Sequence, residues 1–199
     1  FSLANLYYYG SGIEKDLSQA FLWYQRSSSQ GQPYAAYSIA QMYRYGEYVT
    51  KDNDTAQRYY KQALSGFLKI ESDDMANDDL FYKLGQMFNL GLGTDSDVTK
   101  AIEYFRRSAE MNNKNGLFEY GKALLTGEHI PQDTDSAVKL LEKAVKLKNS
   151  NAKRFLALEY ISGEHLEQDF EKGIALLTEC ADSGDVIASY RLSLIHISE

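Results

Sequence analysis

The stretch Gly-Ser-Gly-Ile-Glu-Lys-Asp at residues 10–16 begins a pattern that returns along the whole chain. A glycine followed by an aspartate recurs after 36 residues, then after a further 45, and then twice more after 36. The five pairs are Gly10 with Asp16, Gly46 with Asp52, Gly91 with Asp97, Gly127 with Asp133, and Gly163 with Asp169. A fixed period of roughly 20 to 50 residues is typical of a stacked array of structural repeats. The sequence therefore predicts a solenoid.

Each repeat reads as two short helices joined by a loop. The first helix places a small residue beside large ones, as in Leu3-Ala4-Asn5-Leu6-Tyr7. We expect this helix to end at the repeated glycine, because glycine adopts the left-handed conformation of a C-terminal cap without steric cost. We expect the second helix to begin at the repeated aspartate, because its carboxylate accepts hydrogen bonds from free backbone N–H groups at a helix start.

The second helix of each repeat pairs one small residue with two large ones. In the first repeat these are Ala20, Trp23 and Tyr24, whose spacings of three and four place them on one face. No repeat can bury such a face alone, so neighbouring repeats must cover it. We therefore expect a core that includes Ala20, Ala56, Ala101, Ala137, Trp23, Tyr59 and Tyr104. Cys180 occupies a position where other repeats have serine or alanine, which indicates a small buried residue rather than a nucleophile.

Taken together, these positions resemble the Sel-one-like repeat family, a relative of the tetratricopeptide repeats. The family unit has the form A-x-x-L-G-x-x-Y-x-x-G-x-G-V-x-x-D-x-x-K-A-x-x-W-Y-x-K-A-A-x-x-G. The first unit follows this form from Leu3 to Gly31, and the third follows it from Leu84 to Ala109. The resemblance covers nearly the whole chain in five units, with the start of a sixth at Leu192. It implies an all-α fold, a right-handed α-solenoid (α-α superhelix) of about five helix-turn-helix repeats.

We expect one repeat domain over residues 1–199. Its repeats lie at about 1–34, 35–68, 79–114, 115–150 and 151–186, with a partial repeat at 187–199. An acidic insert at 69–78 should lengthen the connection or extend a helix. The pattern also departs from the family form in places. Residues 127–133 and 163–169 lack the second loop glycine, and Gly173 stands where alanine is expected, at a cost in helix propensity.

The resemblance implies a binding surface rather than an active site, since the family looks like adaptors that hold protein or peptide partners in a groove. In related superhelices the first helix of each repeat lines the concave face. Its variable positions are therefore the candidate partner-binding residues. They are Asn5, Tyr8, Tyr9, Gln41, Arg44, Tyr45, Gln86, Asn89, Lys122 and Leu125.

The residue types at these positions suit a peptide partner. Asn and Gln side chains can hydrogen-bond a peptide backbone, and Tyr and Arg are the types that dominate interface hot spots. The alternative interpretation is that the Asn and Gln side chains only solvate an exposed face.

Tyrosine is concentrated near the start of the chain, where residues 1–60 contain 11 of the 16. The repeat form does not require Tyr8, Tyr9, Tyr45 or Tyr48. Surplus aromatic side chains indicate an apolar, hydrogen-bonding patch for a partner. Alternatively, they pack against a preceding repeat outside this sequence.

Composition limits the classes of partner. The formal charge of −7 and the pI near 5.1 disfavour nucleic acid, because phosphate binding needs a positive field. A membrane-spanning helix needs about 18 apolar residues in a row, and the sequence has no such run. The single cysteine excludes an internal disulfide framework, and a reducing compartment is compatible but not required. The sequence leaves the location unknown and favours the cytoplasm only weakly, because it shows no signal or transmembrane segment. The chain begins and ends inside first-helix patterns, so we expect it to be a piece of a longer repeat protein with further repeats or domains.

The sequence favours neither catalysis nor a cofactor. Gly10-Ser11-Gly12 reads as a helix cap rather than a phosphate loop, because no strand precedes it. His129 and His165 are equivalent loop residues that each follow a glutamate. A metal bridging two repeats there is the minor alternative, since a structural site normally takes four ligands. We therefore predict no catalytic residue, no metal and no cofactor.

The sequence as a whole predicts a protein–protein interaction scaffold or adaptor. The first alternative is a docking or regulatory repeat segment of a larger multidomain enzyme. The second is a hydrolase, which would need a base held against an acid in a cleft.

Overall fold

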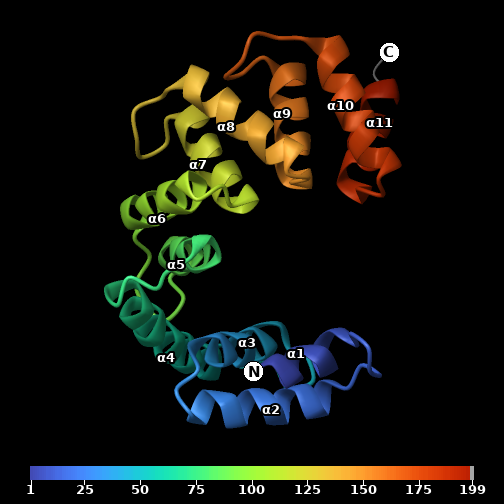
Figure 1. Cartoon of the computed structure of the whole chain (residues 1–199). Coiled ribbons are helices and arrows are strands. Elements are labelled where there is room, and N and C mark those ends of the chain that lie inside the picture. The colour runs from blue at the N-terminus through green and yellow to red at the C-terminus, as the bar shows by residue number, and fades with distance from the viewer. Residues whose placement is uncertain (198–199) are drawn as a thin grey trace. The chain divides into compact units, whose positions relative to one another are not determined.

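The computed structural model describes residues 1–197, and every regular element in that range is an α-helix (Figure 1). Helices that follow one another along the chain pack as pairs, for example α1 with α2, α3 with α4, and α7 with α8. The prediction of an all-α fold built from helix pairs is confirmed. Residues 198–199 of the predicted partial sixth repeat lie outside the described residues. The helices are α1 (Ser2–Tyr9), α2 (Leu17–Ser29), α3 (Pro33–Tyr45), α4 (Asn53–Ser72), α5 (Asp78–Leu90), α6 (Val98–Glu110), α7 (Lys114–Thr126), α8 (Thr134–Lys146), α9 (Ser150–Ser162), α10 (Phe170–Asp182) and α11 (Val186–Ile197).

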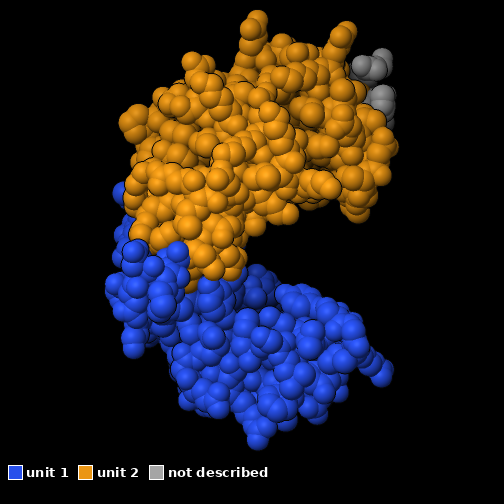
Figure 2. Space-filling view, viewed as in Figure 1, with its two compact units in different colours: residues 1–76, 83–101 blue, residues 77–82, 102–199 orange. Residues whose placement is uncertain are grey.

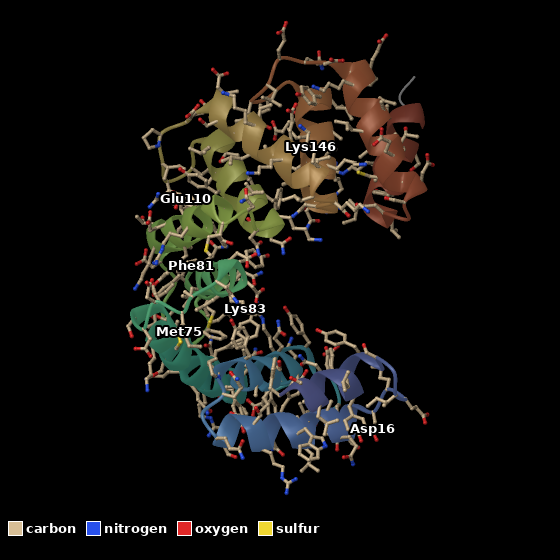
Figure 3. All side chains as sticks on the ribbon, in the orientation of Figure 1. Asp16, Met75, Phe81, Lys83, Glu110 and Lys146 are labelled. Atoms are coloured by element: carbon tan, nitrogen blue, oxygen red, sulfur yellow. The ribbon has the colours of Figure 1, made fainter. Side chains whose placement is uncertain are left out.

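The repeated glycine and aspartate terminate and start the helices as predicted. Gly10 follows α1 directly, has φ +70° and donates its N–H to the carbonyl of Leu6. Asp16 precedes α2, and its carboxylate accepts the N–H groups of Ser18 at 2.9 Å and Gln19 at 3.0 Å (Figure 3). The other four glycines of the pattern also have positive φ, and Asp52, Asp97, Asp133 and Asp169 accept backbone N–H bonds in the same way.

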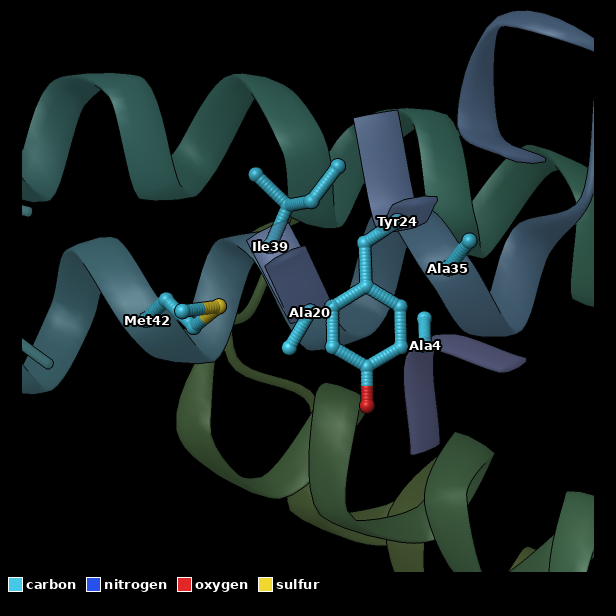
Figure 4. Packing of buried hydrophobic residues seen from close by; sticks show 6 residues of the cluster. All are labelled: Ala4, Ala20, Tyr24, Ala35, Ile39 and Met42. Atoms are coloured by element: carbon cyan, nitrogen blue, oxygen red, sulfur yellow. The ribbon is translucent and has the colours of Figure 1, made fainter. Parts of the chain in front are cut away.

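Small residues of the second helices lie in the core as predicted. Ala20, Ala101 and Ala137 are 0% exposed and Ala56 is 2% exposed. In the first repeat, Ala20 packs in a cluster with Ala4, Tyr24 and Ile39 (Figure 4). Cys180 is also buried, at 2% exposure.

The large residues of the second helices differ from the prediction in some repeats. Tyr104 is buried as expected, but Trp23 and Tyr59 are only half-buried and pack at the edge of the core. The residue that follows each of them, Tyr24 or Tyr60, takes the fully buried position instead. The Arg26 guanidinium covers the outer face of the Trp23 ring, 5.0 Å from its centroid.

Two departures from the repeat form have a structural explanation. The acidic insert extends a helix, because α4 has 20 residues where α2, α6, α8 and α10 have 13 each. Gly173 is required by packing, because a Cβ atom there would lie 2.6 Å from Ile161 Cγ1 and 2.9 Å from the carbonyl oxygen of Ala157. Alanine would clash at this position, so its better helix propensity gives no advantage.

The chain divides into two compact units (Figure 2). Unit 1 comprises residues 1–76 and 83–101, and unit 2 comprises residues 77–82 and 102–199. Unit 1 contains α1 to α4 together with most of α5, and unit 2 contains α7 to α11.

Candidate partner-binding surface

The buried Tyr24 of α2 joins the first helices of two repeats in unit 1. Its ring is 2% exposed and lies in the cluster with Ala4 and Ala20 (Figure 4). Its hydroxyl donates a hydrogen bond of 2.7 Å to Asn5 Oδ1 on α1 and also interacts with the hydroxyl of Ser38 on α3. Burial raises the pKa of Tyr24 to about 12, so the hydroxyl remains a donor at neutral pH. A hydrogen bond from a buried core side chain therefore holds the Asn5 side chain in place.

Tyr60 of α4 has the equivalent role in the next repeat. It is 1% exposed, and its hydroxyl interacts with the Arg44 side chain of α3. Burial raises the pKa of Tyr60, while the Arg44 charge opposes that shift. The Arg44 guanidinium also lies 5.6 Å from the centroid of the Tyr45 ring. Arg44 is thus positioned between a buried hydroxyl and an exposed aromatic ring.

The end of α1 provides further tyrosines. The Tyr8 hydroxyl donates to Glu47 Oε2 at 2.5 Å, which ties α1 to the loop after α3. Burial raises the pKa of Tyr8, and its hydrogen bond with Glu47 adds to the shift. The Tyr9 ring meets the Tyr8 ring edge-on and is 70% exposed, and Tyr45 is 64% exposed.

The residues of α5 that belong to unit 1 continue this surface. Gln86 is half-buried and Asn89 is exposed. The Lys83 ammonium (labelled in Figure 3) lies 5.6 Å from the centroid of the Tyr37 ring on α3. We call the eight unit 1 residues of the predicted set the amide–tyrosine ladder. They are Asn5, Tyr8, Tyr9, Gln41, Arg44, Tyr45, Gln86 and Asn89.

The two predicted residues of unit 2 do not form a comparable surface. Lys122 is exposed, but Leu125 is 0% exposed and packs in a core cluster with Leu124, Ala137 and Leu141. The prediction that Leu125 contacts a partner is therefore wrong, because its position on α7 turns an apolar side chain into the core. The unit 2 equivalents of Tyr24 and Tyr60 are Phe105, Leu141 and Leu177, which have no hydroxyl group.

Sequence reasoning missed the residues that contact the ladder or lie beside it. The repeat pattern predicts Tyr24 only as a large core residue and does not single out Tyr60, Ser38, Glu47 or Lys83. A signal was present in the sequence, because tyrosine occupies this core position in the first two repeats and phenylalanine or leucine occupies it in the other three.

Tyr48 belongs to a different surface. It lies in the loop after α3 with φ +65°, is 57% exposed, and its ring centroid is 5.7 Å from that of Phe21 on α2. It lines both of two shallow pockets, of about 570 and 640 Å³, beside α2. The first is lined by Tyr7, Ile13 and Leu17 among others, and the second by Phe21, Leu22 and Val49.

The loop histidines are not brought together with other metal ligands. His165 Nδ1 lies 3.0 Å from Glu159 Oε2 within one repeat, and His129 is exposed in its own loop. Within the described range of the chain, no group of three His, Cys, Asp or Glu side chains could hold a metal ion. None of the helices in residues 1–197 combines the length and the hydropathy needed to cross a membrane.

Comparisons with known proteins place the chain in a family. The Sel1 repeat profile matches residues 1–32, 33–66, 82–113, 115–149 and 150–185. Repeats of this class generally mediate protein binding. A comparison with curated proteins finds no match.

Solved structures resemble the chain over nearly its whole length. A Sel1 repeat protein from Oxalobacter formigenes is 25% identical, with a TM-score of 0.68 over 98% of this chain and 76% of that one. A sel1 repeat protein from Klebsiella pneumoniae is 18% identical, with a TM-score of 0.54 over 98% and 91%. Protein 5086 of Pseudomonas aeruginosa is 19% identical, with a TM-score of 0.58 over 94% and 69%. With five matched repeats that span most of its residues, the chain belongs to the Sel1 repeat family.

Proposed function

We propose that this protein is an interaction scaffold that binds an extended segment of a protein partner along the amide–tyrosine ladder of unit 1. The observation that supports this most strongly is the pair of buried tyrosines beneath the ladder. Tyr24 donates a hydrogen bond to Asn5 and Tyr60 interacts with Arg44, so two polar side chains of the surface already contact a core hydroxyl before any partner binds.

Such orientation favours binding. A flexible polar side chain loses roughly 0.5–1.5 kcal/mol of conformational freedom when a partner immobilises it. A side chain already held by a core hydroxyl has lost some of that freedom during folding. The unit 2 equivalents, Phe105, Leu141 and Leu177, offer no hydroxyl for this purpose.

The chemistry of the ladder matches an extended polypeptide. Each amide of Asn or Gln offers both a donor and an acceptor, as a peptide backbone requires. Tyr9 and Tyr45 add large exposed rings whose ordering costs little entropy. A segment crossing α1, α3 and α5 would meet Asn5, then Gln41, then Gln86, at equivalent positions of three successive repeats.

The direct test is selection of random 12-residue peptides displayed on phage against the purified protein. The tightest peptide is then titrated against a ladder variant, Gln41→Ala with Tyr45→Ala. We expect its affinity to fall by about tenfold or more, because an interface hot spot typically contributes about 2 kcal/mol or more.

The matched control is Leu22→Ala with Gln25→Ala, which removes one amide and one exposed apolar side chain from α2 outside the ladder. This variant should bind like the wild type. Equal binding by the ladder variant, with its helical circular dichroism unchanged, would refute the assignment of the surface.

A further inference from the structure

Arg44 has an unusual environment for an arginine of this chain. It is half-buried, its guanidinium lies 5.6 Å from the centroid of the Tyr45 ring, and it interacts with the buried Tyr60 hydroxyl. Arg106 pairs with Glu103 and Glu110, and Arg154 pairs with Asp185, whereas Arg26 and Arg58 are exposed to solvent. Among the described residues, no carboxylate forms an ion pair with Arg44.

The remaining N–H groups of the Arg44 guanidinium suit a carboxylate. A guanidinium has five N–H donors in a planar fork, and Tyr60 uses only some of that capacity. The Tyr45 ring lies on one side of the fork, with its centroid 5.6 Å from the guanidinium carbon. A fork with remaining N–H groups binds a carboxylate through two parallel, charge-assisted hydrogen bonds.

We infer that Arg44 binds an aspartate or glutamate side chain of the partner segment, which makes the ladder selective for acidic peptides. This inference rests on the proposed function, because it names the partner class of the same surface. The supporting observation is local charge complementarity between a peptide carboxylate and Arg44, a half-buried cation that no described carboxylate pairs with.

The position of Arg44 favours a side-chain carboxylate over the C-terminal carboxylate of the partner. Arg44 lies on α3, which stands between α1 with Asn5 and α5 with Gln86 in the order of the first helices of the repeats. A segment that used the amides on both sides would continue past Arg44 in both directions. The carboxylate that meets Arg44 therefore comes from within the segment.

A polyanion is a poorer occupant of this surface. The protein's net charge of −7 repels a phosphate chain at long range, and nucleic-acid binding depends on many cationic contacts. One arginine among neutral amides and tyrosines matches one carboxylate in an otherwise uncharged stretch of peptide.

The test compares phage-displayed random 12-residue peptides selected by the wild type with those selected by Arg44→Gln. The matched control is Arg26→Gln, which removes the same charge from an exposed arginine that stacks on Trp23 outside the ladder. We expect the wild type and the control to enrich Asp or Glu at one fixed internal position. The Arg44→Gln variant should select peptides without that preference.

The tightest wild-type peptide is then resynthesised with its acidic residue changed to the matching amide. Its affinity for the wild type and for Arg26→Gln should fall by about tenfold or more, whereas its affinity for Arg44→Gln should change less than about twofold. Arg44→Lys should give an intermediate loss, because lysine retains the charge but lacks the fork. Circular dichroism of each variant confirms that it is folded.

Several outcomes would overturn the inference, and they differ in what they say about the proposed function. Peptides that need Gln41 and Tyr45 but show no acidic preference would leave the proposed function standing and refute the role of Arg44. Loss of binding on amidation of the peptide's C-terminus would show that the terminal carboxylate is the ligand. Selection of no peptide at all, or binding of single-stranded RNA in preference to peptides, would contradict both.

Discussion

Two hydroxyl groups distinguish the amide–tyrosine ladder of unit 1 at the scale of single residues. Tyr24 and Tyr60 fill the core with their rings and present a hydroxyl to Asn5 and Arg44 at the far end. Because burial raises the pKa of both tyrosines, neither hydroxyl loses its proton under ordinary conditions. The same two side chains therefore stabilise the fold and orient the ladder.

Removing the Tyr24 hydroxyl tests this double role. Tyr24→Phe retains the ring but leaves Asn5 Oδ1 without its 2.7 Å donor. We expect the free energy of unfolding in urea to fall by about 1 kcal/mol, the typical net contribution of one hydrogen bond.

The matched control for this change is Tyr9→Phe, which removes a hydroxyl from a side chain that is 70% exposed. It should alter the free energy of unfolding by less than about 0.5 kcal/mol. Equal effects of the two substitutions would mean that the Tyr24 hydroxyl contributes nothing beyond an exposed one.

At the scale of helices and loops, equivalent loops of different repeats pack differently on the neighbouring helix. The loop before α6 packs directly on α4: the Gly93 N–H donates to Gln57 Oε1 at 2.6 Å, and the Gln57 amide donates to the Gly91 carbonyl at 3.0 Å. The loop before α4 has Tyr48 at the position equivalent to Gly93, and Phe21 at the position equivalent to Gln57. The two pockets beside α2 lie at that second junction.

Gly93 and Gly12 form a matched pair for testing loop packing. Both have positive φ, +74° and +79°, but a Cβ atom at Gly93 would lie 2.4 Å from the Lys61 nitrogen, whereas one at Gly12 would meet nothing within 4 Å. Gly12→Ala should cost about 1–2 kcal/mol for the left-handed backbone alone. Gly93→Ala should cost a further 1–3 kcal/mol or so, because the loop must move off α4.

Thermal unfolding of the two alanine variants, followed by circular dichroism, measures this difference. A Gly12→Ala variant as unstable as Gly93→Ala would contradict the close contact between the loop and α4.

The capping aspartates make stability depend on pH. A backbone N–H bond from Gln19 lowers the pKa of Asp16, and side-chain hydrogen bonds from Thr55 and Ser136 lower the pKa values of Asp52 and Asp133. A carboxyl whose pKa is lower in the folded state stabilises the fold above its ordinary pKa of about 3.9 and loses this effect as pH falls below it. The melting temperature should therefore decline below about pH 4.

Replacing these three aspartates with asparagine separates the cap from its charge. Asparagine caps a helix about as well as aspartate and does not titrate. The triple variant should show a smaller fall in melting temperature between pH 5 and about 2.5 than the wild type. An identical fall would assign the acid sensitivity to other carboxyls.

At the scale of the whole molecule, the sequence was a good guide to the repeats. The glycine–aspartate pairs determine where helices end and begin, because both residues act through the local backbone. The alanines at positions 20, 56, 101 and 137 reach the core because helical periodicity alone places them there.

Features that depend on contacts between helices could not be read in this way. The equivalent positions of Arg44 and Leu125 differ in burial because their neighbours differ, and one repeat's sequence does not state what its neighbour presents. Gly173 was expected only to weaken a helix, yet its close approach to Ile161 and Ala157 requires it. A pattern of large and small residues likewise does not predict the hydrogen-bonding roles of the Tyr24 and Tyr60 hydroxyl groups.

The most direct test of the central claim is nuclear magnetic resonance of the ¹⁵N-labelled protein during titration with the tightest peptide from the wild-type selection. The side-chain amide signals of Asn5 and Gln41, both in the ladder, should shift as the peptide binds. The amide of Gln25, exposed on α2 outside the ladder, should remain in place. Shifts at Gln25 with Asn5 and Gln41 unchanged would contradict the proposal that the ladder of unit 1 is the binding surface.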